Sequence, residues 1–172
     1  AFKVLTGKQH GKQVTVVEAL PGLLPAEEPE SGRLLADVFK REGIGVRVGV
    51  KAVGVRHDAS GFTVDLEGGD FLTAQRLLVA TGRRLDLAAT GLGAIGIDAK
   101  AKAVPVDTRL RVATGVWAVG DMTGKVAFTL VSMYQAEIVV SYILGNQGGP
   151  PADYRALPRV TFSDPEFASV GM

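Results

Sequence analysis

Hydrophobic and polar residues alternate in several short runs of this chain, and such runs predict β-strands. Val46, Val48 and Val50, for example, are separated by single residues. Two other runs flank Asp58–Gly61, whose Asp, Ser and Gly residues are typical of the turn of a β-hairpin. Alternation and the turn signal thus predict strands at Val46–Val50, Val53–His57 and Phe62–Glu67, and two short apolar runs predict further strands at Val14–Glu18 and Thr114–Val119.

Two longer segments predict helices. In the first, Pro29 suits the first helical position, Lys40 and Arg41 suit the last turn, and Gly43 suits the stop. The side chains expected on its inward face are Leu34, Leu35, Val38 and Phe39.

The second helix is expected from Leu130 to Leu144, with Thr129 as its N-cap and Gly145-Asn146 as its stop signal. Its hydrophobic residues recur at helical spacing. They form one apolar stripe, made of Val131, Tyr134, Ile138 and Tyr142.

The most informative feature is the Gly120-Asp121 pair, where the predicted strand Thr114–Val119 ends. Gly120 allows the backbone to approach a ligand closely, because it has no Cβ. Asp121 lies at the carboxyl end of the strand, where open α/β sheets bind nucleotides, and its carboxylate suits adjacent sugar or ribityl hydroxyls. A simple Asx turn is the alternative for an isolated Gly-Asp.

Composition narrows the possibilities only a little. The 172 residues suit one domain or slightly more, and the hydrophobic content of 47% is that of an ordinary globular protein. A net charge of +1, without a basic run, argues against a nucleic-acid or anionic-membrane partner. Zero cysteines and two histidines argue against a disulfide framework or a zinc site. No apolar stretch has membrane-spanning length and no signal-peptide pattern is present, so we expect a cytoplasmic protein.

Four motifs, in order along the chain, resemble the pyridine nucleotide-disulfide oxidoreductases, the family of lipoamide dehydrogenase and mercuric reductase. Thr114–Asp121 with the following loop and helix resembles the family's second FAD motif. Leu77–Arg84 resembles the strand ending in Ala-Thr-Gly-Arg that closes its NAD domain. Val14–Glu18 resembles the second strand of that domain, and Phe162–Gly171 resembles the opening of the dimerisation domain.

The resemblance implies an incomplete α/β fold, Rossmann-like and three-layered, that binds FAD and NAD(P) and leads into an α+β interface domain. It divides the chain into the C-terminal part of an NAD-binding domain (1–84), a returning FAD-binding segment (85–149) and the start of a dimerisation domain (150–172).

On the FAD side, the resemblance implies that Gly120 and Asp121 hold the ribityl chain and that Ala127, Phe128 and Thr129 lie along the flavin ring. Free N–H groups at this helix start would stabilise negative charge on the flavin. Family members often carry His at the position of Leu130. Lys125 could contact a phosphate or point into solvent. Arg83 and Arg84 could form a domain-junction salt bridge or contact a cofactor phosphate.

On the NAD side, Glu18 ends its strand, where a carboxylate can accept hydrogen bonds from both adenosine ribose hydroxyls. It would repel a 2′-phosphate and so favours NADH over NADPH. A structural carboxylate near a helix start is the alternative. By resemblance alone, the backbone of Ala52 touches the adenine and that of Gly82 approaches the nicotinamide, although Gly82 also suits a plain strand-to-loop turn.

Other expected family features lie outside these 172 residues. The redox-active cysteine pair and the Gly-rich phosphate turns are missing, and Gly7–Lys12 does not fit a P-loop because its spacing is one residue short. We therefore interpret the chain as a slice of a longer, homodimeric enzyme, inactive alone and prone to aggregate because the edge of its sheet and the strand Pro158–Met172 would lack partners.

The predicted function of the complete protein is transfer of a hydride from NAD(P)H to FAD, with electrons passed to a disulfide, a metal ion or another small-molecule or protein acceptor. No catalytic residue and no metal ligand is assigned within this chain. The alternative is a non-catalytic nucleotide-binding or dimerisation module derived from such an enzyme.

Overall fold

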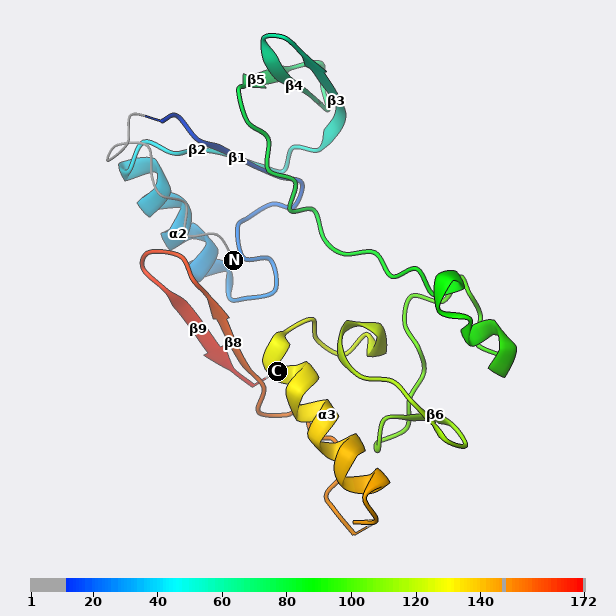
Figure 1. Cartoon of the computed structure of the whole chain (residues 1–172). Helices are drawn as coiled ribbons and strands as arrows, with labels where there is room; N and C mark the ends of the chain where they lie inside the picture. The colour runs from blue at the N-terminus through cyan, green and yellow to red at the C-terminus, as the bar shows by residue number, and fades with distance from the viewer. Residues whose placement is uncertain (1–11, 147, 172) are drawn as a thin grey trace. The chain divides into compact units, whose positions relative to one another are not determined.

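The computed structural model describes residues 12–146 and 148–171 (Figure 1). The loop predicted at Gly7–Lys12 therefore lies outside the described residues, apart from Lys12. The chain forms two compact units, and each is described by itself. Unit 1 consists of the described residues up to Ala80 and those from Ala156 onwards, and unit 2 is Thr81–Arg155. The domain boundaries expected from the sequence remain predictions.

Unit 1 begins with a strand–helix–strand arrangement (Figure 1), as the hydrophobic pattern predicts. Strands β1 (Thr15–Glu18) and β2 (Gly45–Val48) pair in parallel, with Val16 opposite Val46. Helix α2 (Pro29–Arg41) connects them and packs on β2. Parallel neighbours need such a crossover, because a tight turn cannot reverse the chain twice.

One residue of the expected inward face of α2 is exposed. Leu35 is buried, whereas the Leu34 side chain is 57% exposed, so the prediction for Leu34 was wrong. Consecutive helical residues point about 100° apart, and one of two adjacent leucines must turn away from the sheet.

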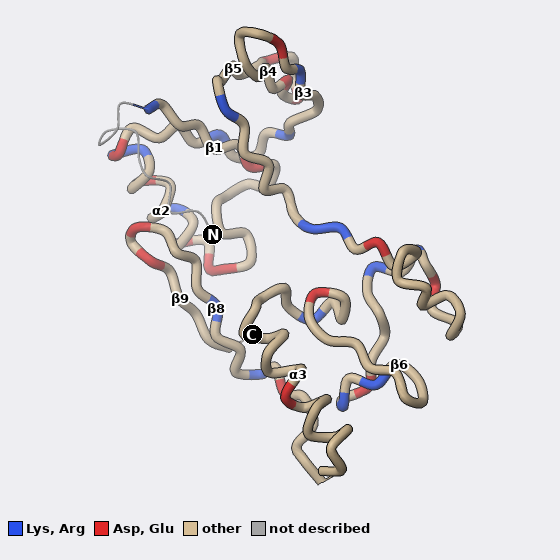
Figure 2. Tube along the Cα trace, in the orientation of Figure 1, with Lys and Arg blue, Asp and Glu red and all other residues tan. Residues whose placement is uncertain are grey.

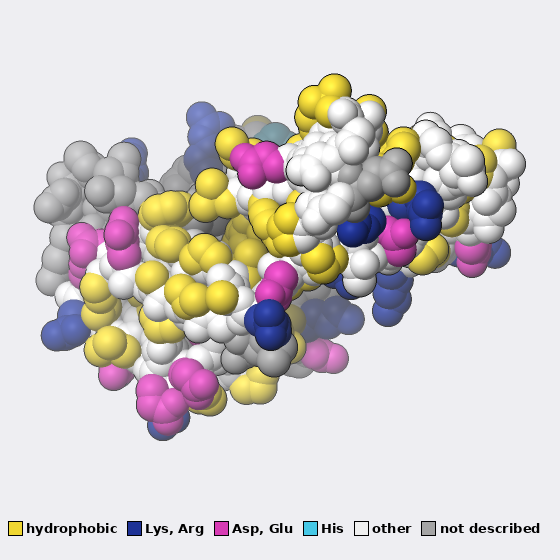
Figure 3. All heavy atoms as spheres, turned by 90° about the horizontal axis from the view of Figure 1, so that it is seen from below, with side chains coloured by type: hydrophobic (Ala, Val, Ile, Leu, Met, Phe, Trp, Pro, Cys, Tyr) yellow, Lys and Arg dark blue, Asp and Glu magenta, His cyan; other side chains and the backbone are white. Residues whose placement is uncertain are grey.

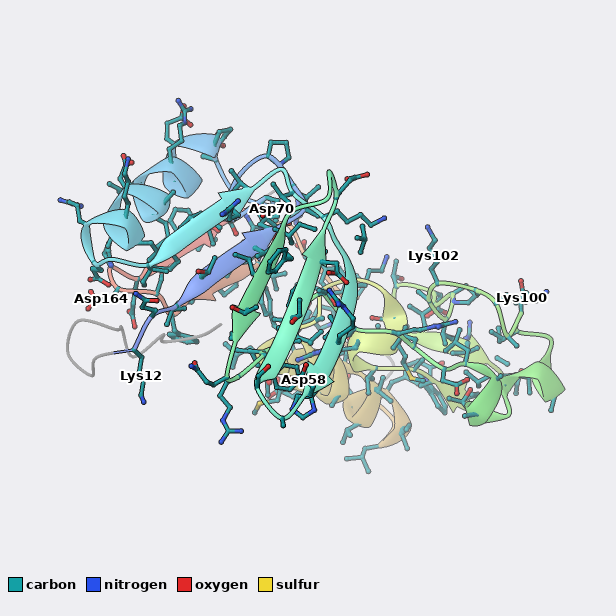
Figure 4. All side chains as sticks on the ribbon, turned by 90° about the horizontal axis from the view of Figure 1, so that it is seen from above. Lys12, Asp58, Asp70, Lys100, Lys102 and Asp164 are labelled. Atoms are coloured by element: carbon teal, nitrogen blue, oxygen red, sulfur yellow. The ribbon has the colours of Figure 1, made fainter. Side chains whose placement is uncertain are left out.

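The next three strands of unit 1 form an antiparallel sheet in the order β3–β4–β5. The predicted hairpin is confirmed in β3 (Ala52–Asp58) and β4 (Gly61–Leu66). Strand β5 (Phe71–Ala74) was not predicted, although Gly68-Gly69 before it is a turn signal. Asp58 and Asp70 mark the turns at opposite ends of β4 (Figure 4).

No strand forms within Leu77–Arg84, where the family resemblance implies one. Residues 75–82 form no strand in the part of the chain that the structure describes, and the Leu78 and Val79 side chains are 65% and 68% exposed. A short apolar run becomes a strand only when a neighbour accepts and donates its backbone hydrogen bonds. The described residues supply no such neighbour, so the prediction of a strand was wrong for this chain.

Unit 1 ends with a hairpin of strands β8 (Pro158–Thr161) and β9 (Phe167–Val170). The expectation of an unpartnered strand here was wrong, because the two halves of the segment pair with each other. Arg159 on β8 donates to both carboxylate oxygens of Glu27, at 3.1 and 3.2 Å, and the Ser169 hydroxyl donates to the same carboxylate at 2.9 Å. These bonds fix the hairpin to the loop before α2.

Unit 2 is built around a small core of Leu87, Val104 and Ala118. Irregular segments surround it, with 3₁₀ turns η1 (Ala88–Thr90), η2 (Leu92–Ile95) and η3 (Gly120–Thr123). A two-stranded antiparallel sheet pairs β6 (Arg111–Ala113) with β7 (Val116–Trp117), and helix α3 (Thr129–Ile143) packs on η3.

The boundaries in unit 2 differ slightly from those expected. The apolar run Thr114–Val119 forms a strand only over Val116–Trp117, because Gly115 turns the chain back onto β6. Helix α3 has its N-cap at Phe128 without a side-chain cap, so Thr129 is the first helical residue and its assignment as N-cap was wrong. Phe128 has extended backbone angles and its carbonyl accepts the first helical bond, from Ser132.

The described residues contain no helix that is long and apolar enough to cross a membrane.

The Glu27–Arg159 contact generates a stability prediction. The Glu27 side chain is 10% exposed and that of Arg159 is 25% exposed. Replacing Glu27 with Gln should lower the free energy of unfolding of the full-length protein by about 1–3 kcal/mol at neutral pH, because a charge-assisted bond is lost. Urea unfolding measures the change, with exposed Glu28→Gln as the matched control.

The pH dependence follows from the lowered pKa of Glu27, whose main cause is the hydrogen bond from Arg159. The unfolded chain binds the Glu27 proton more tightly than the folded chain does. The stabilisation is therefore complete above the ordinary pKa of 4.5 and is lost as the pH falls through the lower folded pKa. Wild type and Glu27→Gln should converge on acidification, and a difference that grows toward low pH would contradict this assignment.

Candidate functional site

The Gly120-Asp121 pair lies in a tightly held turn of unit 2. Ala118, just after β7, is buried and donates its N–H to the Leu110 carbonyl at 3.0 Å. Gly120 is buried and has a φ of 76°, a conformation that favours glycine. A Cβ at this position would come within 3.1 Å of Ser132 Oγ on α3. The turn and the helix are thus in close contact at Gly120.

Asp121 forms an ion pair with Arg83. Arg83 Nη1 lies 2.5 Å from Asp121 Oδ2, and the two side chains are 70% and 31% exposed. The sequence left Arg83 between a domain-junction salt bridge and a phosphate contact, and the structure pairs it with Asp121. The other carboxylate oxygen, Oδ1, receives no hydrogen bond from the described residues. Asp121 therefore keeps an acceptor for a ligand hydroxyl.

A buried side-chain amide fixes the turn from the helix side. Gln135 on α3 is fully buried, and its Oε1 accepts the Gly120 N–H at 2.5 Å. Its Nε2 donates to Thr123 Oγ1 at 3.2 Å and to the Tyr154 hydroxyl at 2.9 Å. The Thr123 hydroxyl donates to the Gly120 carbonyl at 2.8 Å. Sequence reasoning missed Gln135, although a lone amide among the apolar residues of a helix was a usable signal.

The start of α3 presents free backbone donors. The N–H groups of Thr129, Leu130 and Val131 have no acceptor among the described residues, as expected for the first turn of a helix. Ala127, Phe128 and Thr129 are exposed, so the segment expected along the flavin ring is accessible. The partial positive charge of the helix start favours negative charge nearby.

An open depression lies beside the Arg83–Asp121 pair. Two segments of unit 2 supply its basic residues, and Figure 2 shows positive charge on both of them. Lys100 and Lys102 lie on one of these segments (Figure 4). The residues lining it are Arg83, Arg84, Leu85, Ala99, Lys100, Ala101, Lys102 and Asp121. The depression is therefore positively charged overall, apart from the Asp121 carboxylate.

The expected NAD residues Glu18 and Ala52 come from neighbouring parts of unit 1. Glu18 ends β1, and its backbone carbonyl accepts the Val50 N–H at 3.2 Å, two residues before Ala52. The Glu18 side chain bonds locally, with Oε1 accepting the Leu20 N–H at 2.9 Å. The second oxygen has no donor among the described residues. Ala52 is exposed at the start of β3.

Gly82 belongs to unit 2 and has a φ of 119°, which side-chain-bearing residues rarely adopt. Its position within an irregular segment agrees with the plain turn that the sequence left open.

The donor sets fit the two cofactors expected from the sequence. Asp121 offers an oxygen acceptor for a hydroxyl, and the first turn of α3 offers N–H donors for a flavin edge. Glu18 offers a carboxylate oxygen to a ribose. The assignment of individual residues to FAD and NAD remains a prediction.

The chain is similar in sequence to curated oxidoreductases. A dihydrolipoyl dehydrogenase from Mycobacterium leprae is 32% identical over 170 residues, which are 96% of this chain and 36% of the relative. A mercuric reductase from Shewanella putrefaciens is 34% identical over 164 residues, with 94% of this chain and 29% of the relative covered. The chain thus spans about a third of the length of these curated relatives.

Solved structures give the same result. The chain matches LpdA from Mycobacterium tuberculosis with a TM-score of 0.84 and 29% identity, covering 94% of this chain and 36% of LpdA. It matches the HOCl-induced flavoprotein disulfide reductase RclA from Escherichia coli with a TM-score of 0.81 and 30% identity, covering 94% of this chain and 37% of RclA. The fold is therefore an incomplete, Rossmann-like α/β fold.

The sequence profile of the pyridine nucleotide-disulphide oxidoreductases matches residues 5–136, most of this chain. Together with the relatives that align with nearly all of this chain, this match shows that the chain belongs to the pyridine nucleotide-disulphide oxidoreductase family.

Proposed function

We propose that the full-length protein is a flavoenzyme that oxidises NADH and passes the electrons to a disulfide or a metal ion. Members of this family use FAD and NAD(P)H. The relatives named above include a mercuric reductase and a flavoprotein disulfide reductase, which supports these two classes of acceptor.

The observation that carries the proposal is the Gly120-Asp121 turn. Its carboxylate is oriented on one side by Arg83 and keeps its second oxygen free. Its backbone is held by Gln135, so the position of the carboxylate is set before any ligand arrives. A preorganised acceptor next to free helix N–H groups suits a ligand that combines hydroxyls with an electron-accepting ring, which describes FAD.

Each group has a separate role in this proposal. Asp121 would accept a ribityl hydroxyl through Oδ1, and the ion pair with Arg83 orients the carboxylate. The N–H groups of Thr129 and Leu130 stabilise negative charge on the ring when it is reduced. When bound, FAD would supply the redox chemistry of this site.

Glu18 supports NADH as the reductant. The bond from the Leu20 N–H fixes one carboxylate oxygen and leaves the other for the adenosine ribose. The 2′-phosphate of NADPH would bring negative charge against this carboxylate. The proposed enzyme therefore uses NADH in preference to NADPH.

The β8–β9 hairpin supports a homodimer. Val160, Phe162 and Val170 of this segment expose 38%, 56% and 70% of their surface, so the hairpin offers apolar side chains that a second copy of the chain could cover. Hydrophobic side chains also lie open on the molecular face drawn in Figure 3. The proposal places the complete enzyme in the cytoplasm as a dimer formed through this region.

Asp121→Ala tests the proposed FAD site. In the full-length protein, the dissociation constant of FAD should rise about 10- to 100-fold, because a charge-assisted hydrogen bond to the ribityl chain is lost. The measurement is titration of the apoprotein with FAD, followed by flavin fluorescence. Asp37→Ala is the control, since Asp37 is exposed on α2.

Undiminished FAD affinity in Asp121→Ala would contradict the proposal. A full-length wild-type protein that is colourless and does not reduce a dye with NADH would also contradict it, because that result identifies the non-catalytic module instead.

Glu18→Ala tests the choice of reductant. Loss of the ribose acceptor should raise the KM for NADH about 10-fold and leave kcat nearly unchanged. The ratio of kcat/KM for NADH to that for NADPH should therefore fall. Dye reduction by the full-length enzyme at varied NADH and NADPH measures both constants, and exposed Glu28→Ala serves as the control. Equal discrimination in wild type and Glu18→Ala would remove Glu18 from the site.

A further inference from the structure

Gln135 on α3 is a buried amide whose donors and acceptor are all hydrogen-bonded. It is fully buried, and both N–H groups and the carbonyl oxygen of its amide have partners. The three partners come from two separate segments: Gly120 and Thr123 from η3, and Tyr154 from the segment that leads out of unit 2. One amide therefore joins the candidate FAD turn to the end of the unit.

The orientation of the amide is determined by its partners. The Gly120 N–H can only donate, so it must face Oε1. Nε2 then faces Thr123 Oγ1, whose own proton goes to the Gly120 carbonyl, and the Tyr154 oxygen. Rotating the amide by half a turn would place two N–H groups against each other at 2.5 Å, so only one arrangement satisfies the site.

Tyr154 is itself held firmly in unit 2. Its ring packs edge-on against Tyr134, with the ring centroids 6.2 Å apart, and Lys125 Nζ lies 5.9 Å from the centre of the Tyr154 ring. The Tyr134 hydroxyl accepts the Asp153 N–H at 2.8 Å. Adjacent residues of α3, Tyr134 and Gln135, thus hold adjacent residues of the exit segment.

We propose that Gln135 is a positioning residue for the Asp121 carboxylate, and that Tyr154 acts through Gln135 to couple the FAD turn to the exit segment. Neither side chain touches the ligand in this proposal. Gln135 sets the path of the backbone at Gly120, and that path sets where Asp121 stands. The inference rests on the proposed function, because Asp121 must bind FAD for its position to matter.

Gln135 contributes hydrogen bonds to buried backbone and side-chain groups, in addition to packing. If the amide is replaced by an apolar group, the buried Gly120 N–H has no acceptor left among the described residues. A buried donor without an acceptor is unfavourable, so the backbone at Gly120 would shift until its N–H reaches water. Gly120 directly precedes Asp121, so this shift would move the carboxylate. Removing the Tyr154 hydroxyl has a smaller effect, because Nε2 keeps Thr123 as an acceptor.

Three variants of the full-length protein separate these contributions. Gln135→Leu removes the acceptor and both donors, and should weaken FAD binding about 10- to 100-fold. In Gln135→Glu, burial favours the neutral acid, which keeps a carbonyl acceptor for the Gly120 N–H and one O–H donor toward Tyr154 or Thr123. This variant should therefore restore affinity to within about fivefold of wild type. Tyr154→Phe should weaken binding about three- to tenfold.

The readouts distinguish positioning from general damage to the fold. FAD dissociation constants come from titration of the apoproteins, and the visible circular dichroism of bound flavin reports its orientation. The KM for NADH should stay within about twofold in all three variants, because Glu18 lies in the other unit. Matched controls are Glu137→Leu, exposed on α3, and Tyr142→Phe, whose hydroxyl has no hydrogen-bond partner among the described residues.

Asp121→Ala in the same series keeps the two hypotheses apart. If Asp121→Ala binds FAD normally, the proposed function fails. If Asp121→Ala releases FAD while Gln135→Leu and Tyr154→Phe bind it as wild type does, only the positioning role is overturned. The positioning role is also overturned if Gln135→Glu weakens FAD binding as much as Gln135→Leu does. If Gln135→Leu does not fold, the FAD affinities of Tyr154→Phe and Gln135→Glu still test the positioning role.

Discussion

The hydrogen bond from the Gly120 N–H to Gln135 Oε1 is the interaction on which the candidate site depends. It joins a turn with little regular structure to a 15-residue helix, in a place that solvent does not reach. A buried donor without a partner costs about 1–3 kcal/mol, so the turn and the helix cannot easily separate. The carboxylate of Asp121 and the free N–H groups of α3 therefore keep a fixed relation to each other.

Unit 2 needs this kind of fixation because it has few other means of order. Its sheet consists of two short strands, and its core is formed by a handful of apolar residues such as Leu87 and Val104. Turns and 3₁₀ segments supply most of the remaining backbone. In such a unit, side-chain hydrogen bonds to backbone groups take over the positioning that a larger sheet supplies elsewhere.

Local pattern predicted the elements that are stabilised by neighbours within this chain. Strand β1, helix α2, strand β2 and the β3–β4 hairpin agree with their hydrophobic spacing and turn residues, because each finds its partner nearby in sequence. The segment Leu77–Arg84 resembles a strand of the family and includes a short apolar run, but it has no pairing partner among the described residues. Pattern alone cannot tell these situations apart.

The site was predictable to a similar extent. Gly120 and Asp121 were found because a glycine and a carboxylate follow an apolar run, and their family motif is local. The partners Arg83 and Gln135 lie 38 and 15 residues away from their contacts. The lone amide in an apolar helix marks Gln135 as a candidate, but no local pattern identifies which groups Gln135 and Arg83 contact. Thr129 was misassigned because a hydroxyl before a helix is a common cap, whereas the extended backbone at Phe128 places the boundary one residue earlier.

If the bond to Gln135 preforms the Gly120-Asp121 turn, the turn is already ordered in the full-length apoprotein. Hydrogen–deuterium exchange of the Gly120 amide measures this order. We expect slow exchange, comparable to that of amides inside α3, because the donor is buried and bonded. Exchange as fast as that of an exposed loop amide, slowed only after FAD is added, would contradict it.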